Sequence, residues 1–66
     1  MRVLGIDPGT ATTGWGVVEL VKNQYKLVAH GTITTSKDLQ LSDRLEIIYN
    51  ELEELINKYK PEKASV

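Results

Sequence analysis

The sequence predicts an α/β fold: a three-stranded antiparallel meander, then one long helix, then the start of a fourth strand parallel to the first. Three observations carry this prediction. Short β-prone runs separated by turn residues fill the first half of the chain, the apolar residues then change from a period of two to a helical period, and a proline precedes one more short run.

The first strand is predicted over residues 2–7, because its aliphatic residues favour extended backbone and Pro8-Gly9 ends the run. Asp7 therefore stands at the carboxyl end of a strand, which is where α/β domains bind ligands. An ionised side chain there needs a partner, so Asp7 is the main candidate for a functional residue. The alternative is an Asp7 that only accepts hydrogen bonds from the amides of the following turn.

The second strand is predicted over residues 12–22 and the third over 25–35, joined by a tight hairpin at Lys22-Asn23-Gln24. In the second strand, two glycines lie on the face opposite Trp15 and leave space there. Such space suits either the close approach of another element or, as we expect, a packed helix. The glycines are Gly14 and Gly16.

Strict alternation along the third strand predicts two different faces. The more apolar face carries Tyr25, Leu27, Ala29, Gly31 and Ile33. The more polar face carries Lys26, Val28, His30, Thr32 and Thr34, which suits a strand near the edge of the sheet. We expect His30 to be an exposed or hydrogen-bonded edge residue, because no acid or nucleophile accompanies it in a motif.

A helix is predicted over residues 39–59, since apolar residues recur there at alternating intervals of four and three. They form one stripe: Leu41, Leu45, Ile48, Leu52, Leu55 and Tyr59. The opposite face is charged and is expected to be solvated. Pro61 ends the helix, and residues 63–66 begin a fourth strand, which a right-handed crossover would make parallel to the first. Such a plan normally continues, so we expect residues 1–66 to be the N-terminal part of a single longer domain.

Composition excludes several classes of site. The chain has no cysteine and one histidine, which rules out disulfides, thiolate zinc sites and histidine-rich metal sites, so any metal would be hard and oxygen-bound. The formal charge of −1 lacks the basic footprint of a stand-alone nucleic-acid binder. No apolar run reaches the ~20 residues of a membrane span, and no signal peptide is evident. We therefore expect a cytoplasmic protein with no membrane partner.

Several motifs in this order resemble the start of the RuvC family of crossover (Holliday) junction endodeoxyribonucleases. The motifs are Gly5-Ile6-Asp7-Pro8-Gly9-Thr10, Thr13-Gly14-Trp15-Gly16-Val17-Val18, Gly31-Thr32-Ile33-Thr34-Thr35, Leu41-Ser42-Asp43-Arg44-Leu45 and Ile48-Tyr49. The resemblance runs the length of the chain but covers only about the first third of that family's catalytic domain.

The resemblance implies an RNase H-like fold and a homodimer that cuts opposing strands of a four-way DNA junction in recombination and repair. It implies Mg²⁺ held by four acidic residues, with Asp7 as the first catalytic and metal-binding residue. The second would be a glutamate that aligns directly after Val66, and the others lie further on. Branch-migration helicase subunits are partners by the same resemblance, and the 66 residues alone are expected to be inactive.

The chemistry agrees with this reading. Two-metal phosphodiester hydrolysis needs cations about 3.5–4 Å apart, and Mg²⁺ prefers carboxylate oxygens. Asp7 could hold such ions only with further carboxylates beside it. Glu62 precedes the fourth strand, and a strand of about four residues rises roughly 13 Å, so Glu62 is expected to lie too far from Asp7 to share an ion.

Two other functions remain open at this point. The same opening resembles the first phosphate motif of actin, sugar-kinase and heat-shock ATPases, in which Gly9, Thr10, Thr12 and Thr13 would cradle nucleotide phosphates. It also resembles the small RNase H-like nucleases that act on ribosomal RNA precursors. As for assembly, we expect the 66 residues by themselves to self-associate through an exposed sheet edge.

Overall fold

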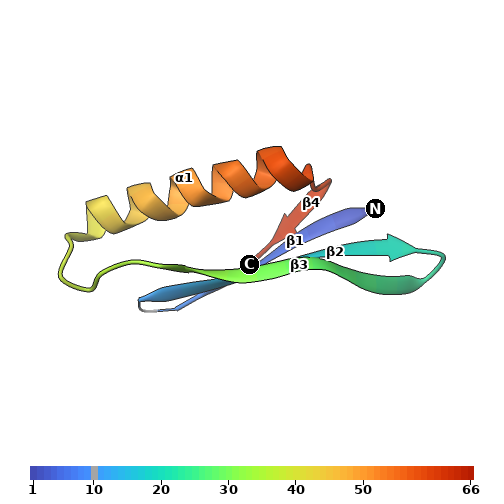
Figure 1. Cartoon of the computed structure of the whole chain (residues 1–66), viewed down its shortest axis with the longest axis horizontal. Helices are drawn as coiled ribbons and strands as arrows, with labels where there is room; N and C mark the ends of the chain where they lie inside the picture. The colour runs from blue at the N-terminus through green and yellow to red at the C-terminus, as the bar shows by residue number, and fades with distance from the viewer. Residues whose placement is uncertain (10) are drawn as a thin grey trace.

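The computed structural model describes residues 1–9 and 11–66, which form one sheet and one helix (Figure 1). The elements are β1 (Arg2–Pro8), β2 (Thr12–Val21), β3 (Gln24–Thr34), α1 (Leu41–Tyr59) and β4 (Lys63–Ser65). The sheet order is β3-β2-β1-β4, with β1 to β3 antiparallel and β4 parallel to β1. This confirms the predicted fold class.

The observed bounds differ from the predicted ones by one or two residues at several ends. β1 extends to Pro8 because Pro8 pairs with Thr13 across the hairpin. The helix begins at Leu41 rather than at residue 39, because the Leu39 amide donates to the Ser36 carbonyl at 3.2 Å and so belongs to a turn. In the described part of the chain, no helix is both long and apolar enough to cross a membrane.

The hairpin between β2 and β3 is tight, as predicted, but its turn has two residues instead of the three at Lys22-Asn23-Gln24. Val21 pairs with Gln24, and the two residues between them have positive φ, 50° for Lys22 and 66° for Asn23. Two successive positive φ angles give a type I′ turn, whose twist matches that of the flanking strands. Gln24 therefore already belongs to β3.

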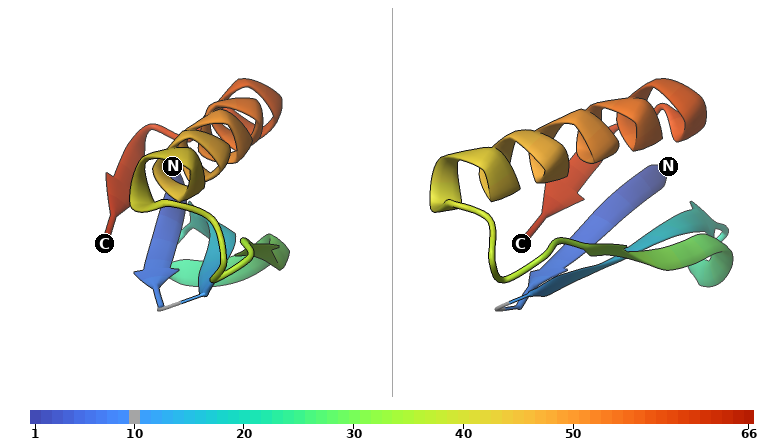
Figure 2. Two further views of the ribbon diagram at one scale, coloured as in Figure 1. Left: turned by 90° about the vertical axis from the view of Figure 1, so that its left-hand side faces the viewer. Right: turned by 60° about the vertical axis from the view of Figure 1, so that its left-hand side comes forward.

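Helix α1 lies over one face of the sheet, and no other described element covers the opposite face (Figures 1 and 2). We call these the helix face, to which Leu4, Trp15 and Val17 belong, and the open face, to which Asp7 belongs. The assignment follows from the contact between the Trp15 and Tyr59 rings, whose centroids are 6.1 Å apart, and from alternation along the strands.

Helix α1 covers the Trp15 side of β2 and not the glycine side, so α1 is not the helix that we expected over Gly14 and Gly16. Since β3, β1 and β4 run in the same direction, the path from β3 through α1 to β4 is a parallel crossover. The right-handedness of such crossovers sets the face that the helix covers. Gly14 and Gly16 remain on the open face.

The prediction that side chains alternate strictly between the two faces along β3 is wrong, because a β-bulge interrupts the strand. Val17 pairs with Ala29 whereas Val18 pairs with Leu27, so Val28 is the additional residue. The additional residue shifts the alternation, and Leu27 shares the open face with Val18 instead of following Ala29 onto the helix face. Tyr25, which pairs with Leu20, lies on the open face for the same reason. As a result, the side chains of Tyr25 and Leu27 are exposed.

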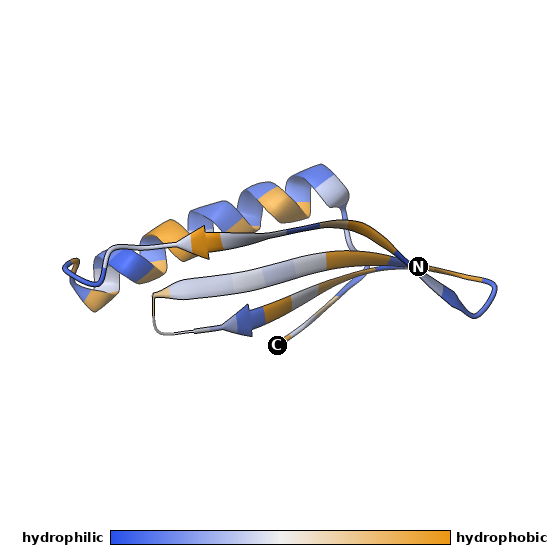
Figure 3. Ribbon diagram, turned by 60° about the horizontal axis from the view of Figure 1, so that its bottom comes forward, coloured by the Kyte–Doolittle hydropathy of each residue, from blue (hydrophilic) through white to orange (hydrophobic). Residues whose placement is uncertain are grey.

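The core is small and belongs to the sheet. Leu4 and Val17 are fully buried and Ile33 is 5% exposed, all on the helix face. The predicted apolar stripe of α1 is only partly covered, and no residue of α1 is fully buried. Leu41 and Leu45, near its start, are 67% and 55% exposed. Figure 3 shows apolar and hydrophilic residues interspersed along α1 and apolar stretches within the strands.

Helix α1 ends at a residue in left-handed conformation. Lys60 has φ 49° and ψ 56°, and its amide donates to the Ile56 carbonyl at 2.8 Å. The next residue is Pro61, which cannot continue a helix. This confirms the predicted end of the helix.

Replacing Lys60 with glycine is expected to raise the free energy of unfolding by about 1 kcal/mol, because glycine adopts left-handed backbone without the steric cost that a side chain carries. Urea unfolding would measure the change. The matched control is Lys58→Gly inside the helix, which is expected to lower stability by about 1 kcal/mol. Destabilisation by Lys60→Gly would contradict this account of the helix end.

Candidate functional site

Asp7 lies at the carboxyl end of β1, as the sequence predicted, and it is exposed on the open face. Its cross-strand partner in β2 is Gly14. A Cβ atom at Gly14 would lie 3.9 Å from the Asp7 Cβ, in ordinary van der Waals contact. The glycine therefore leaves the flank of the carboxylate free of any side chain, so that a ligand or another segment can approach it.

Asp7 stands at one end of an open depression of about 600 Å³ on this face. Four glycines contribute to it, among them Gly5 on β1 and Gly14 and Gly16 on β2, so bare backbone forms much of its floor. Its other lining residues are Val3, Ile6, Trp15, Val18, Gly31, Ser65 and Val66. The carboxylate is the one acidic group in this otherwise largely apolar lining.

The turn that follows Asp7 is tight. A Cβ atom at Gly9 would lie 2.5 Å from the carbonyl oxygen of Thr12, which is backbone and cannot move aside cheaply. Only glycine fits there without displacing the turn. Thr10, which the phosphate-cradle interpretation invokes, lies outside the described residues.

Two hydrogen bonds link Ala11, on the β2 side of this turn, to Thr35 after β3 and through Thr35 to Arg44 on α1. The Thr35 amide donates to the Ala11 carbonyl at 3.0 Å, and the Arg44 Nε–H donates to Thr35 Oγ1 at 3.2 Å. Thr35 is 5% exposed. The start of α1 is thus tied to the loop beside Asp7.

The described residues bring no second acidic group to Asp7, and none of them form a cluster of three or more His, Cys, Asp or Glu side chains. The Glu62 amide donates to the Arg2 carbonyl at 2.8 Å, at the opposite end of β1 from Asp7. The predicted separation of Glu62 from Asp7 is confirmed. His30 is exposed on the edge strand β3, as expected.

The pairing of β4 with β1 determines which positions meet at the edge of the sheet that carries Asp7. Ser65 is the register partner of Gly5, with the two strands parallel. If the same register continues, Val66 lies beside Ile6 and the position directly after Val66 lies beside Asp7. Parallel neighbouring strands place their carboxyl ends at the same edge of the sheet, which is the arrangement that a shared metal ion requires.

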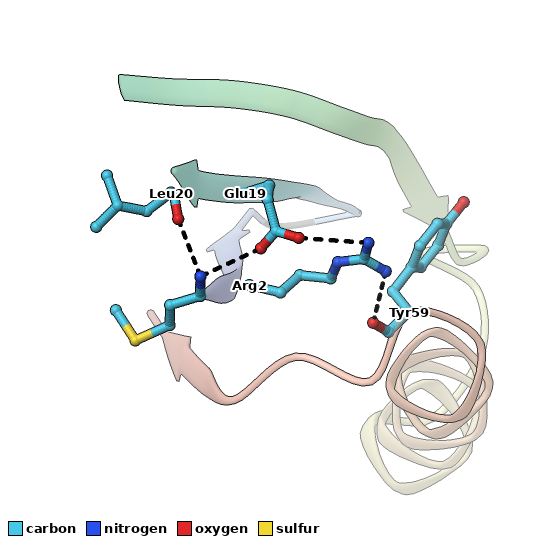
Figure 4. Close-up of polar contacts among 5 residues, drawn as sticks. Arg2, Glu19, Leu20 and Tyr59 are labelled. Carbon is cyan, nitrogen blue, oxygen red and sulfur yellow. Dashed lines mark hydrogen bonds and ion pairs between the residues drawn. The ribbon is translucent and has the colours of Figure 1, made fainter. Parts of the chain in front are cut away.

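One group of contacts was not predicted from the sequence. The side chain of Arg2, at the start of β1, reaches the end of α1 and also Glu19 on β2 (Figure 4). Glu19 in addition lies 3.4 Å from the amino group of Met1. Glu19 and Tyr59, at the end of α1, lie 17 and 57 positions from Arg2 in sequence, and no local pattern links them. Arginine at the start of a strand was the only signal, and it is not specific.

The chain matches the family model described as "Crossover junction endodeoxyribonuclease RuvC" over residues 3–66. It is 53% identical over all 66 residues to the crossover junction endodeoxyribonuclease RuvC of Fusobacterium nucleatum, of which it covers 35%. The chain spans 35% to 40% of the length of this and a second curated relative.

Solved structures agree. A Thermus thermophilus RuvC in complex with a Holliday junction substrate superposes with a TM-score of 0.85 at 30% identity, over 98% of this chain and 42% of that one. An Aquifex aeolicus member of the Ppx/GppA family gives a TM-score of 0.76 at 25% identity, over 98% of this chain and 25% of that one. Because this backbone arrangement occurs in differently named families, the fold by itself does not identify the activity.

Proposed function

Because the chain belongs to the RuvC family, we propose that it forms the N-terminal part of a single-domain nuclease that resolves four-way DNA junctions in recombination and repair. The observation that supports this most directly is the exposed carboxylate of Asp7 at the carboxyl end of β1, beside the parallel strand β4. Catalytic acids of a sheet-based hydrolase are expected at this edge.

Asp7 is the proposed catalytic residue and first metal ligand, and Mg²⁺ is the proposed ion. A hard, exposed carboxylate with an unobstructed flank at Gly14 fits one ligand position. The described residues do not complete a site, so the remaining ligands must come from elsewhere in the protein. When bound, Mg²⁺ would stabilise negative charge on the oxygens of the phosphodiester.

The next ligand is proposed to be a glutamate directly after Val66. If the register of β4 on β1 continues beyond Ser65, that position lies beside Asp7. A homodimer is proposed because two opposing DNA strands must be cut and one such site can hold only one of them. Branch-migration helicase subunits are proposed partners on the basis of family membership alone. The cellular compartment proposed is the cytoplasm.

We expect the 66 residues by themselves to leave a four-way DNA junction uncut in Mg²⁺, because Asp7 alone cannot hold the ions that phosphodiester hydrolysis requires. A nuclease of full family length that carries this chain is expected to cut the same junction into paired nicked duplexes. Gel analysis of a labelled junction measures both. Cleavage by the pure 66-residue chain that Asp7→Asn abolishes would contradict the first expectation.

The two other functions are tested with the same full-length nuclease. Structured ribosomal RNA precursor in place of junction DNA tests the RNA-processing alternative, and calorimetry with ATP tests the phosphate-cradle alternative. The structure weighs against the latter, because Thr13 is 3% exposed on the helix face and its hydroxyl is not presented to a ligand. ATP binding without junction cleavage would overturn the nuclease proposal. Self-association of the 66 residues through a sheet edge stays a prediction, to be checked by sedimentation.

A further inference from the structure

Arg2 connects four elements at the end of the sheet that is remote from Asp7, and Figure 4 shows its side-chain contacts with Glu19 and Tyr59. Its Nη1 donates to the Tyr59 carbonyl at the end of α1, at 3.0 Å, and its Nη2 lies 3.6 Å from Glu19 Oε1 on β2. Its own backbone carbonyl accepts a hydrogen bond from the Glu62 amide at 2.8 Å, directly before β4 begins. Arg2 itself is the first residue of β1. We call Arg2, Glu19, Tyr59 and Glu62 the Arg2 clamp.

Little else in the described chain holds β4 in place. It has three residues, Lys63–Ser65, all of them exposed, and within the described residues it pairs only with β1. Register is weakly specified in a strand that buries neither face, and a slip of one residue turns every side chain to the other face of the sheet. The point at which the chain leaves α1 and joins β1 therefore decides the register, and that point is the Arg2 clamp.

The register has a consequence at the other end of β1. Ser65 lies beside Gly5, and continuation of the same register would bring the position directly after Val66 beside Asp7. A slip of one residue would displace it by about 3.3 Å along the strand and turn its side chain to the helix face. Mg²⁺ requires near-ideal octahedral geometry with metal–oxygen distances of about 2.0–2.1 Å. A ligand displaced by this much could no longer coordinate the ion.

We propose that Arg2 is a positioning residue, which fixes the register of β4 on β1 and thereby holds the next metal ligand beside Asp7. This inference rests on the proposed metal site at Asp7. The guanidinium suits the task because it donates a hydrogen bond to the helix-end carbonyl while it forms an ion pair with the Glu19 carboxylate, and because a cation is favourable at a helix C-terminus.

The test uses a nuclease of full family length that carries this chain, with Arg2→Met, which keeps the apolar stem and removes the donors. The Mg²⁺ concentration for half-maximal junction cleavage is expected to rise about tenfold. This is the lower end of the effects that are typical when a residue that orients a metal ligand is replaced. Junction binding measured without metal is expected to stay unchanged. Arg2→Lys should restore much of the Mg²⁺ response, because an ammonium can still donate to the Tyr59 carbonyl.

The matched control is Glu19→Gln, which weakens the ion pair but leaves the Arg2 bond to Tyr59. It is expected to shift the half-maximal Mg²⁺ concentration by less than about twofold, because a partly exposed ion pair contributes little. If Glu19→Gln shifts the half-maximal Mg²⁺ concentration as much as Arg2→Met does, the hydrogen bond from Arg2 to the Tyr59 carbonyl is not what positions β4.

A second readout needs neither metal nor activity. Cross-strand NMR contacts between Gly5 and Ser65 report the register directly, and they are expected to weaken in Arg2→Met at a temperature where the protein stays folded. If Arg2→Met lowers the unfolding temperature but leaves both the register contacts and the Mg²⁺ dependence unchanged, Arg2 is only structural and the proposal fails. If the unmodified nuclease does not cleave the junction, the proposed function fails instead. The NMR contacts between Gly5 and Ser65 then still test the role of Arg2.

Discussion

Replacing Asp7 with asparagine in a nuclease of full family length is expected to reduce junction cleavage about a thousandfold, while junction binding persists. The amide is nearly isosteric with the carboxylate but carries no charge, so the ion that would stabilise the reacting phosphate is held poorly. Charge stabilisation by a metal ion contributes several kcal/mol, and roughly 4 kcal/mol corresponds to a thousandfold in rate. Single-turnover cleavage of a labelled junction in Mg²⁺ measures the loss.

Two controls separate a catalytic loss from an unfolded protein. Asp7 is exposed and pairs with Gly14 through backbone alone, so the unfolding temperature of Asp7→Asn should match that of the unmodified protein. Glu62→Gln changes a carboxylate at the other end of β1 and should leave cleavage intact, because Glu62 contacts Arg2 through its backbone amide. Full activity of Asp7→Asn would rule out Asp7 as a metal ligand.

Replacing Leu4 with alanine is expected to lower the free energy of unfolding by about 3 kcal/mol, within the range for buried leucines. Leu4 is fully buried on the helix face, and its register partner is Val17, which is fully buried as well. Since only three apolar residues of the described chain form the buried core, the loss is a large part of the stability available to these 66 residues by themselves. Urea unfolding followed by circular dichroism would measure it.

The matched control for this prediction is Leu41→Ala, the same substitution at a position that is 67% exposed near the start of α1. Its cost is expected to stay below about 1 kcal/mol, as for most surface substitutions. Equal losses from Leu4→Ala and Leu41→Ala would mean that the buried sheet residues do not form the core described above.

Local patterns were sufficient to predict every element of the fold to within one or two residues. Extended runs, the positive-φ turn at Lys22-Asn23, the helical period and Pro61 each act over a few residues, so they can be read without knowing the tertiary structure. The placement of Asp7 at a strand end belongs to this class. The helix began late, at Leu41, because a turn at Ser36 and Leu39 competes with it locally.

The sequence by itself thus determined the element order, the fold class and the position of Asp7, because each depends on neighbours along the chain. Only the tertiary structure decided which face α1 covers, that the bulge at Val28 turns Tyr25 and Leu27 to the open face, and that Arg2 joins the ends of α1 and β4. The physical reason is the same in each case: crossover handedness, strand register and hydrogen bonds between distant residues arise from segments that meet only on folding.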